Sequence, residues 1–225
     1  MIDEKTIFYE VRNNISMMCG DDCLGADVAA AMGVAMSNKM RSVCVAPKSV
    51  PEVWPWVEKS RVKIISRFVI TGAVNDDSLS ELSKQINASF RDGADGAIVF
   101  MSRRDVSKFA TDIISIRDDL FFNKIFGIGI DINEVGPFDW DELFGFLQIL
   151  RADSLCLTFN DDTGNKSDFV GRVFAMLNAN RGKWGGVVHF ILNQNIARID
   201  QVFRFIQNLA PDTAAKTEFY ISENV

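Results

Sequence analysis

The sequence predicts a (β/α)8 TIM barrel, and three observations carry that prediction. Strand-like runs alternate with helix-like segments along all 225 residues, which favours right-handed crossovers and a parallel sheet covered by helices. There are eight strand-like runs, the number that closes such a barrel, and the length is near the lower limit for the fold. Several runs also divide into one apolar set and one small or polar set of alternate residues. An open, doubly wound parallel sheet is the alternative.

The division into two sets is clearest in residues 126–133, 153–160 and 187–193. Successive side chains of a strand point to opposite faces, so one set should pack against helices and the other should face a lumen. The small or polar set comprises Gly127, Gly129, Asp131, Asn133, Ser154, Cys156, Thr158, Asn160, His189 and Asn193. Its polar members gather where the strands end, which predicts a barrel with a modest polar pocket at its mouth.

The eight predicted strands are 7–11, 42–47, 62–71, 96–101, 124–132, 153–159, 186–192 and 218–222. The helices predicted between them are 24–40, a short helix from Pro51, 76–92, 105–120, 138–150, 167–178 and 196–209. The chain ends with the eighth strand, so we expect the usual final helix to be missing or replaced by the N-terminal segment. No linker, low-complexity tract or convincing repeat interrupts the alternation, so residues 1–225 are predicted to form one domain.

Helix boundaries are marked by acidic residues at the start and glycine at the end. Asp21 and Asp22 precede the first helix, which is rich in alanine and methionine. Residues 76–92 begin with two aspartates, end before Gly93 and carry an apolar stripe at helical spacing. No Gly-rich phosphate loop follows the first strand, because Cys19-Gly20 leads directly into acidic residues. This absence argues against the open dinucleotide-binding sheet.

Composition narrows the class of protein. The formal net charge is −6 and no basic block occurs, so we expect no nucleic-acid partner. No apolar run approaches the ~18 residues of a membrane span and no signal peptide is recognisable, so a cytoplasmic protein with reduced thiols is expected. Four cysteines and a single histidine offer too few ligands for a structural zinc site. We expect neither a metal nor another cofactor.

Four segments, in order and at suitable spacing, resemble deoxyribose-phosphate aldolase. They are Ser-Val-Cys-Val-Ala-Pro-Lys at 42–48, Thr-Gly followed by Asn-Asp-Asp at 71–77, Gly-Ala-Asp at 93–95, and Ala-Asp with the later Thr and Thr-Gly at 152–164. The similarity extends over roughly residues 20 to 165. It implies a class I aldolase barrel, an enzyme type in which a lysine amine forms a Schiff base and a second cation lowers its pKa.

The departures from that family concern its chemistry. Matching the motifs places Cys156 where the resemblance calls for the Schiff-base lysine, His189 at the helper lysine and Ile98 at the strand-four aspartate. No lysine takes an inward position at the middle or C-terminal end of a predicted strand. The phosphate-gripping elements are replaced by Asn-Gln-Asn at 193–195 and Ser-Glu-Asn at 222–224. We therefore expect a divergent barrel that, if active, is a lyase without lysine chemistry.

The predicted site occupies the ends of the central strands. Cys156 and His189 are expected on adjacent strands about 4.8 Å apart, where an imidazole could activate a thiol, or where both could simply fill the core. Asp131 and Glu134 end the fifth strand, where barrel enzymes keep catalytic groups, although helix capping would also explain them. His189, Cys156, Asp131 and Glu134 are the candidate catalytic residues. The candidate substrate-binding residues are Cys44, Ser102, Thr158, Asn160 and Asn193.

Two functions remain open from the sequence. The first is a divergent aldolase-like barrel that binds or cleaves a small carbonyl or sugar-like compound. The alternative is a pseudoenzyme, a catalytically inactive barrel that serves as an interaction or scaffold protein. Its partner surface would comprise Trp54, Trp56, Phe121, Phe122 and Trp140. The sequence also leaves open whether the chain forms a homo-oligomer.

Overall fold

Eight parallel strands close into a barrel in the order β1 to β8, with β8 pairing to β1. The computed structural model describes residues 11–70, 76–120, 123–159, 166–192 and 196–222. The strands are β1 (Ile15–Met18), β2 (Ser42–Val45), β3 (Lys63–Val69), β4 (Gly96–Phe100), β5 (Ile125–Asp131), β6 (Ser154–Thr158), β7 (Val187–Ile191) and β8 (Thr217–Ser222). The predicted (β/α)8 barrel is thus confirmed, and the open sheet is ruled out by the β8–β1 pairing.

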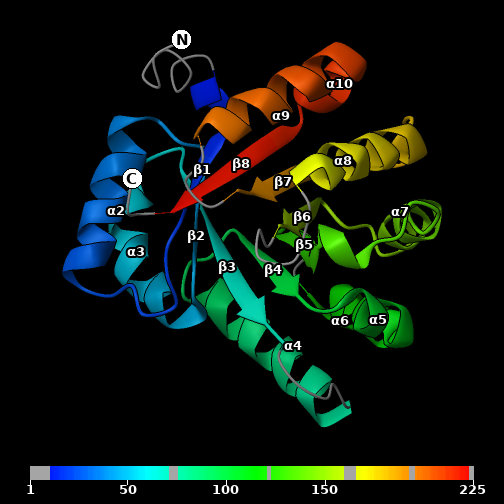
Figure 1. Cartoon of the computed structure of the whole chain (residues 1–225). Helices are drawn as coiled ribbons and strands as arrows, with labels where there is room; N and C mark the ends of the chain where they lie inside the picture. The colour runs from blue at the N-terminus through cyan, green and yellow to red at the C-terminus, as the bar shows by residue number, and fades with distance from the viewer. Residues whose placement is uncertain (1–10, 71–75, 121–122, 160–165, 193–195, 223–225) are drawn as a thin grey trace.

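Helices surround the ring of strands (Figure 1). They are α2 (Ala26–Ser37), α3 (Val50–Val57), α4 (Asp76–Arg91), α5 (Arg103–Lys108), α6 (Ala110–Asp119), α7 (Trp140–Ile149), α8 (Lys166–Asn180), α9 (Ile196–Leu209) and α10 (Pro211–Ala214). Short 3-10 turns lie at Arg12–Asn14, Pro47–Ser49 and Ile132–Glu134. Most predicted elements therefore lie within a few residues of their observed positions, and α9 has the predicted limits.

Two predicted elements require correction, and one observed helix was missed. The first strand is Ile15–Met18 and not 7–11; Val11 lies outside any strand, and residues 7–10 fall outside the described residues. The helix predicted at 105–120 is two helices, because Phe109 has φ −108° and ψ 25°, which interrupts the helical backbone. It also begins earlier, since the Ser102 hydroxyl accepts a hydrogen bond from the Asp105 N–H and caps the first turn. The short helix α10 was not predicted.

The alternation along the strands separates two hydrophobic clusters, as the sequence pattern predicted. Leu155 and Leu157 of β6 are buried in the large cluster that joins the strands to the helices. Cys156, which lies between them, belongs instead to a small cluster inside the barrel. That inner cluster comprises Met18, Cys44, Ile65, Ile98, Cys156 and Tyr220. The outer cluster supplies most of the apolar burial, which at ~25 cal/mol per Å² is the main stabilising contribution.

Two aspartates fix the starts of neighbouring strands. Asp95, just before β4, donates its N–H to the Ile64 carbonyl at 2.8 Å, and its Oδ2 accepts the Ile64 N–H at 2.9 Å. Asp153, just before β6, forms the same pair of bonds with Phe126 of β5, at 2.8 and 2.9 Å. Each aspartate thus satisfies backbone groups at the N-terminal end of the barrel and sets the register of two adjacent strands.

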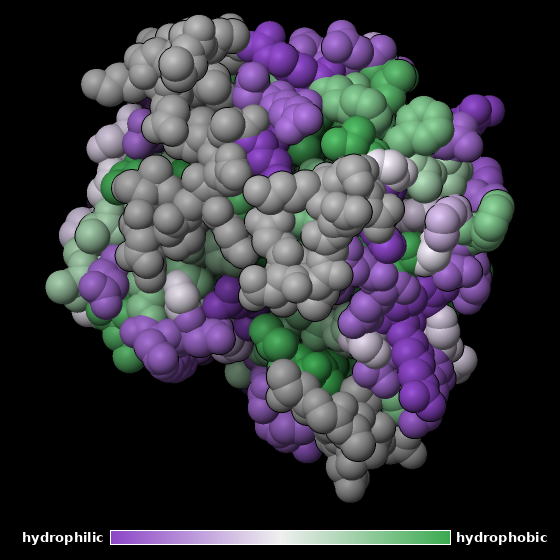
Figure 2. Space-filling view, viewed as in Figure 1, coloured by the Kyte–Doolittle hydropathy of each residue, from purple (hydrophilic) through white to green (hydrophobic). Residues whose placement is uncertain are grey.

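The outer surface is mainly polar. Hydrophilic side chains cover much of the outward faces of the helices in Figure 2, with smaller hydrophobic patches between them. Within the described ranges, no helix combines the length and the apolar character needed to cross a membrane. The large apolar residues are therefore mostly enclosed between the barrel and its helices.

We expect Gly96→Ala to lower the free energy of unfolding by ~1–3 kcal/mol, because the added methyl overfills the lumen. A Cβ at Gly96 would lie 2.6 Å from the Ile125 Cβ and 3.0 Å from its carbonyl oxygen, neither of which can move without the backbone. Urea unfolding at equilibrium measures the change. Gly145→Ala in α7 is the matched control: nothing lies within 4 Å of its Cβ, so a gain of up to ~1 kcal/mol is expected there. Equal effects at the two positions would contradict the packing argument.

Candidate functional site at the mouth of the barrel

The inner cluster divides the barrel lumen into two cavities. One, of about 460 Å³, lies at the C-terminal ends of the strands, and the other, of about 780 Å³, lies at their N-terminal ends. On β7, Ile191 lines the first cavity and His189, two residues earlier, lines the second. Cys44 and Cys156 belong to the layer between them and line neither cavity. A residue's height along its strand therefore decides which end of the barrel it serves.

Four predicted site residues meet at the C-terminal mouth. Asp131, Glu134, Ser102 and Thr158 all line the 460 Å³ cavity, with β4, β5 and β6 and the turns that follow β4 and β5 placing them there. Active sites of (β/α)8 barrels are built at this end of the strands. The cavity is therefore the candidate functional site.

These four side chains are partly engaged by the protein itself. Asp131 Oδ1 accepts the Asn133 N–H at 2.8 Å, and Glu134 Oε2 accepts the Arg103 N–H at 2.6 Å. The Ser102 hydroxyl donates to Asp105 Oδ2 at 2.7 Å, and it also caps α5. Thr158 Oγ1 donates a long bond of 3.4 Å to the Ile130 carbonyl. The second oxygen of each carboxylate, Asp131 Oδ2 and Glu134 Oε1, has no hydrogen bond among these contacts.

Arg67 brings a cation into the same mouth. It takes an inward position on β3, its side chain is only 14% exposed, and it lines the 460 Å³ cavity. One terminal nitrogen pairs with Asp21, while the buried Nε has no hydrogen-bond partner. Because Arg67 lines the cavity, its guanidinium is a donor group that a bound acceptor could meet. From the sequence, Arg67 is a cation that could contact an anionic ligand or be solvated, and it was not included among the candidate binding residues.

Neither lumen cysteine has the properties of an activated nucleophile. Burial raises the pKa of the Cys156 thiol well above its usual value, with the nearby Cys44 thiol acting in the same direction. Burial likewise raises the pKa of Cys44 to about 12. Both thiols are consequently neutral near pH 7, and thiolate is the form that attacks or binds metals. Their observed contacts are those of small apolar residues that fill the barrel.

His189 lies beside Cys156, as predicted, but faces the other cavity. The two residues are register partners on β7 and β6. The imidazole stacks on Tyr220, with ring centres 5.1 Å apart, and Nδ1 lies 3.6 Å from Glu218 Oε2. Burial lowers the pKa of His189 to about 4; Glu218 opposes that shift and Arg41 adds to it. The four candidate catalytic residues are therefore not gathered in one cavity.

The network around His189 was not predicted. Glu218 accepts hydrogen bonds from Arg41 Nη1 at 3.1 Å and from the Ser16 hydroxyl at 3.2 Å. Ser42 connects Ser16, at 2.9 Å, to the Tyr220 hydroxyl, at 3.3 Å. Alternation within β8, where Glu218 and Tyr220 share a face with inward residues of β1, is the sequence signal that would have found it.

The remaining predictions fall elsewhere. Asn160 and Asn193 lie outside the described residues, as do Phe121 and Phe122. Among the residues that the structure describes, no three His, Cys, Asp or Glu side chains are grouped closely enough to hold a metal ion. Trp140 was expected on a partner surface, but it is fully buried against Phe144. This placement is corrected because α7 turns the indole towards the core.

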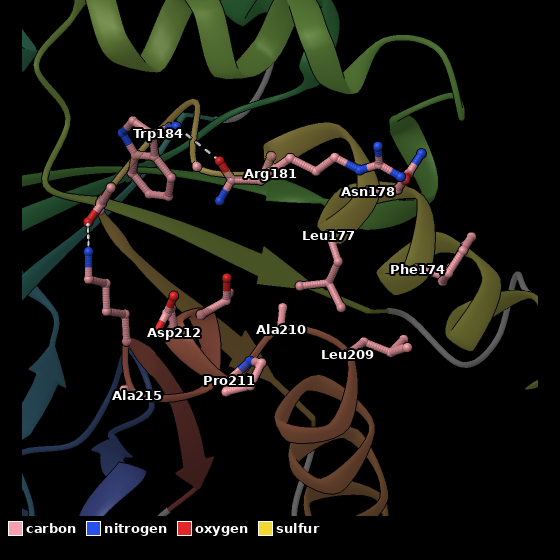
Figure 3. A pocket seen from close by; sticks show the side chains of 16 residues that line it. Phe174, Leu177, Asn178, Arg181, Trp184, Leu209, Ala210, Pro211, Asp212 and Ala215 are labelled. Carbon is pink, nitrogen blue, oxygen red and sulfur yellow. Dashed lines mark hydrogen bonds between the residues drawn. The ribbon is translucent and has the colours of Figure 1, made fainter.

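A larger groove of about 970 Å³ lies outside the barrel, between α8 and the α9–α10 segment (Figure 3). Trp184 is at one end, and Phe174 and Leu209 lie towards the other. The backbone N–H of Trp184 donates to Asn180 Oδ1 at 3.0 Å, and Lys216 Nζ donates to the Gly185 carbonyl at 3.0 Å. None of the predicted site residues lines this groove.

Solved structures share this barrel. No protein-family profile matches the chain, and no curated protein is significantly similar in sequence. A putative deoxyribose-phosphate aldolase from Toxoplasma gondii ME49 superposes with a TM-score of 0.77 at 14% identity, covering 98% of this chain and 93% of that one. A tetrameric deoxyribose phosphate aldolase from Aeropyrum pernix gives 0.70 at 13% identity, with 98% and 92% coverage.

The putative copper homeostasis protein CutC from Streptococcus agalactiae gives a TM-score of 0.66 at 8% identity, covering 92% of this chain and 97% of that one. Likenesses at such low identity concern the fold. The chain has a deoxyribose-phosphate aldolase-like barrel, as the sequence motifs indicated.

We expect none of the four thiols to react quickly with Ellman's reagent in the folded protein. All four cysteines are buried, and the pKa values of the two in the lumen are raised. Release of the thionitrobenzoate chromophore near pH 8 should be slow in native protein and should reach four equivalents in concentrated guanidinium chloride. Cys156→Ala should leave the native rate unchanged. Rapid labelling that disappears in Cys156→Ala would show a thiolate in the lumen.

The single histidine should make stability depend on pH. The pKa of His189 is about 4 in the folded state, below the ordinary 6.5, so the unfolded chain takes up the proton first. The free energy of unfolding therefore falls as pH drops from about 6.5 to about 4 and is unaffected by this residue above that window. Between pH 7.5 and pH 5 the residue should remove about 2 kcal/mol.

Urea unfolding of the wild type and of His189→Gln at both pH values isolates this effect, since glutamine keeps polarity without titrating. The wild type should lose more stability than the variant over this interval. Equal losses in the two proteins would show that the imidazole is protonated as readily in the folded state as in the unfolded chain.

Proposed function

We propose that the C-terminal mouth binds a small, uncharged carbonyl or sugar-like compound without forming a Schiff base. The observation that carries the proposal is the composition of the 460 Å³ cavity. It places Arg67, Asp131, Glu134 and Thr158 around one space, and no lysine is among its described lining residues. A hydroxyl group can donate to the carboxylates, and hydroxyl and carbonyl oxygens can both accept from the guanidinium.

Charge favours a ligand without phosphate. Arg67 is the cation that lines the mouth, and it is already paired with Asp21. Asp131 and Glu134 add two carboxylates, so the described lining has an excess of negative charge. A phosphate group would be repelled at short range, whereas a polyol or a hydroxyaldehyde would not. The solved aldolases of similar fold are named for a phosphorylated sugar, so the proposed ligand differs from theirs in charge.

A lyase reaction at this mouth would depend on carboxylates. Asp131 has one oxygen held by the Asn133 N–H, and its Oδ2 is left to accept a substrate hydroxyl proton. The Arg67 guanidinium, which lines the same cavity, can donate to a carbonyl oxygen that becomes negative as a carbon–carbon bond breaks. The lumen thiols and His189 do not line the cavity, so they are not assigned a part in this chemistry.

The proposal is tested by calorimetric titration of small aldehydes, hydroxyaldehydes and free sugars, each paired with its phosphorylated form. Unphosphorylated members of the series should bind more tightly. Asp131→Asn should weaken binding about tenfold or more, as expected for loss of a hydrogen bond to a charged group. Asp118→Asn is the matched control, since Asp118 lies on the surface in a pair with Arg151.

Borohydride reduction in the presence of the same aldehydes should trap no protein adduct. Mass spectrometry of the intact chain gives the result. An adduct on any lysine would overturn the non-covalent assignment, and tighter binding of the phosphorylated series at the mouth would overturn the charge argument.

The scaffold alternative is supported by only some of the aromatic residues expected on a partner surface. Trp54 and Trp56 are 40% and 52% exposed on α3, a surface that a partner or a second copy of the chain could cover. Trp140 is buried and contributes nothing to it. The tetrameric Aeropyrum pernix enzyme shows that a barrel of this fold can assemble with itself. Sedimentation of the wild type and of Trp56→Ser tests this alternative, because self-association through α3 would weaken in the variant.

A further inference from the structure

The N-terminal end of the barrel contains a second cavity, to which the proposed function gives no role. It measures about 780 Å³ and is lined by strand starts and by the helix–strand joints that precede them. The inner cluster separates it from the proposed ligand mouth. Its size is within the range of small-molecule sites, ~300–1,000 Å³. All of its lining residues lie in the described part of the chain.

Four cations line this cavity near the starts of β2 and β3, in a chain that is acidic overall. Lys39, Arg41, Arg61 and Lys63 line it, against the carboxylates of Asp153 and Glu218. Two positive charges are therefore in excess, although the whole chain has a formal net charge of −6.

Both carboxylates are already engaged by the protein. Glu218 accepts from Arg41 and Ser16, and Asp153 accepts from the Phe126 N–H and Arg117. Lys39, Arg61 and Lys63, by contrast, have no carboxylate partner among the described residues. Three cations at the cavity are thus free to meet an anion.

The inner end of the cavity contains a polar group without a partner. The His189 side chain is only 9% exposed, and its Nδ1 forms no hydrogen bond, since Glu218 Oε2 is 3.6 Å away. Stacking on Tyr220, whose hydroxyl is held by Ser42, fixes the ring. A neutral imidazole offers one donor and one acceptor, and leaving either buried and unmatched is costly. Because His189 lines the cavity, its ring offers a bound group a polar surface at the inner end.

Apolar walls complete the site. Ile65, Ile98 and Ile125 line the cavity between its charged rim and the His189–Tyr220 stack. A ligand that fits these surfaces has an anionic group for the lysines and arginines and a compact apolar or ring-shaped body. We propose that the N-terminal cavity is a second binding site, specific for a small organic anion that carries a carboxylate or a phosphate.

The chain offers a specific reporter for this site, because His189 is its only histidine. Its imidazole proton signals can be followed by NMR while benzoate, benzyl phosphate, inorganic phosphate or neutral benzyl alcohol is added. We expect benzoate or benzyl phosphate to shift these signals saturably, and benzyl alcohol to leave them unchanged. The tighter of the two organic anions identifies the anionic group, and inorganic phosphate alone should bind more weakly because it lacks the apolar body.

The double variant Arg61→Met, Lys63→Met removes two exposed cations while keeping side-chain length, and it should weaken anion binding about tenfold or more. Lys84→Met is the control, because Lys84 pairs with Glu81 on the exposed face of α4. Asp131→Asn, at the opposite mouth, should leave the His189 titration unchanged, so the two proposals fail independently. No saturable shift with any anion, or equal affinity in the double variant and the wild type, would overturn the second site.

Discussion

Closure of eight parallel strands around a lumen filled at mid-height is the constraint on which the rest of this structure depends. Every inward side chain must share the space enclosed by the ring, and the inner cluster takes up its centre with residues of moderate size. Two glycines on β5 make room for their neighbours: a Cβ on Gly127 would lie 2.2 Å from the Ser154 hydroxyl, and one on Gly129 would lie 2.2 Å from the Phe100 ring. Because interiors pack as tightly as organic crystals, such a layer leaves no passage, and polar groups above and below it act separately.

The segments that resemble the aldolases describe how the barrel is built. Asp95 and Asp153, in the Gly-Ala-Asp and Ala-Asp segments, each form two hydrogen bonds with the backbone of the preceding strand. Both lie at the N-terminal ends of strands, away from the mouth where barrel enzymes perform their chemistry. Strand register needs these aspartates and does not depend on which inward side chain stands at position 156, so the likeness of the segments is compatible with a cysteine there. Resemblance at these positions therefore predicts the fold and does not predict an activity.

Sequence periodicity predicted well which side chains face the lumen, and predicted poorly at which level along the barrel axis they lie. The alternation placed Cys156 and His189 on adjacent strands and inside the ring, and the register confirms it. The pattern repeats every two residues, so it says which side a residue faces and nothing about its level along the barrel axis. That level is set by the stagger between strands on closure, a property of the whole ring. For this reason Asp131 and Thr158 lie together at the C-terminal mouth, as predicted, whereas His189 lines the cavity at the opposite end. The four-residue β1 was missed because so short a run gives the periodicity little to act on.

The charged side chains at the two ends of the barrel give an excess of opposite sign, and burial determines whether His189 adds to the positive end. At the N-terminal end, Glu218 is matched by Arg41 and the Ser16 hydroxyl, so its charge does not require an imidazolium. Desolvation then outweighs the attraction of Glu218 and holds His189 neutral, which leaves the positive charge on the rim, where lysines and arginines remain hydrated. At the C-terminal end Arg67 is the largely buried charge, and it lines the same cavity as the carboxylates of Asp131 and Glu134. Because the inner cluster lies between them, the proposed anion site and the proposed site for hydroxyl groups need not share a single pocket.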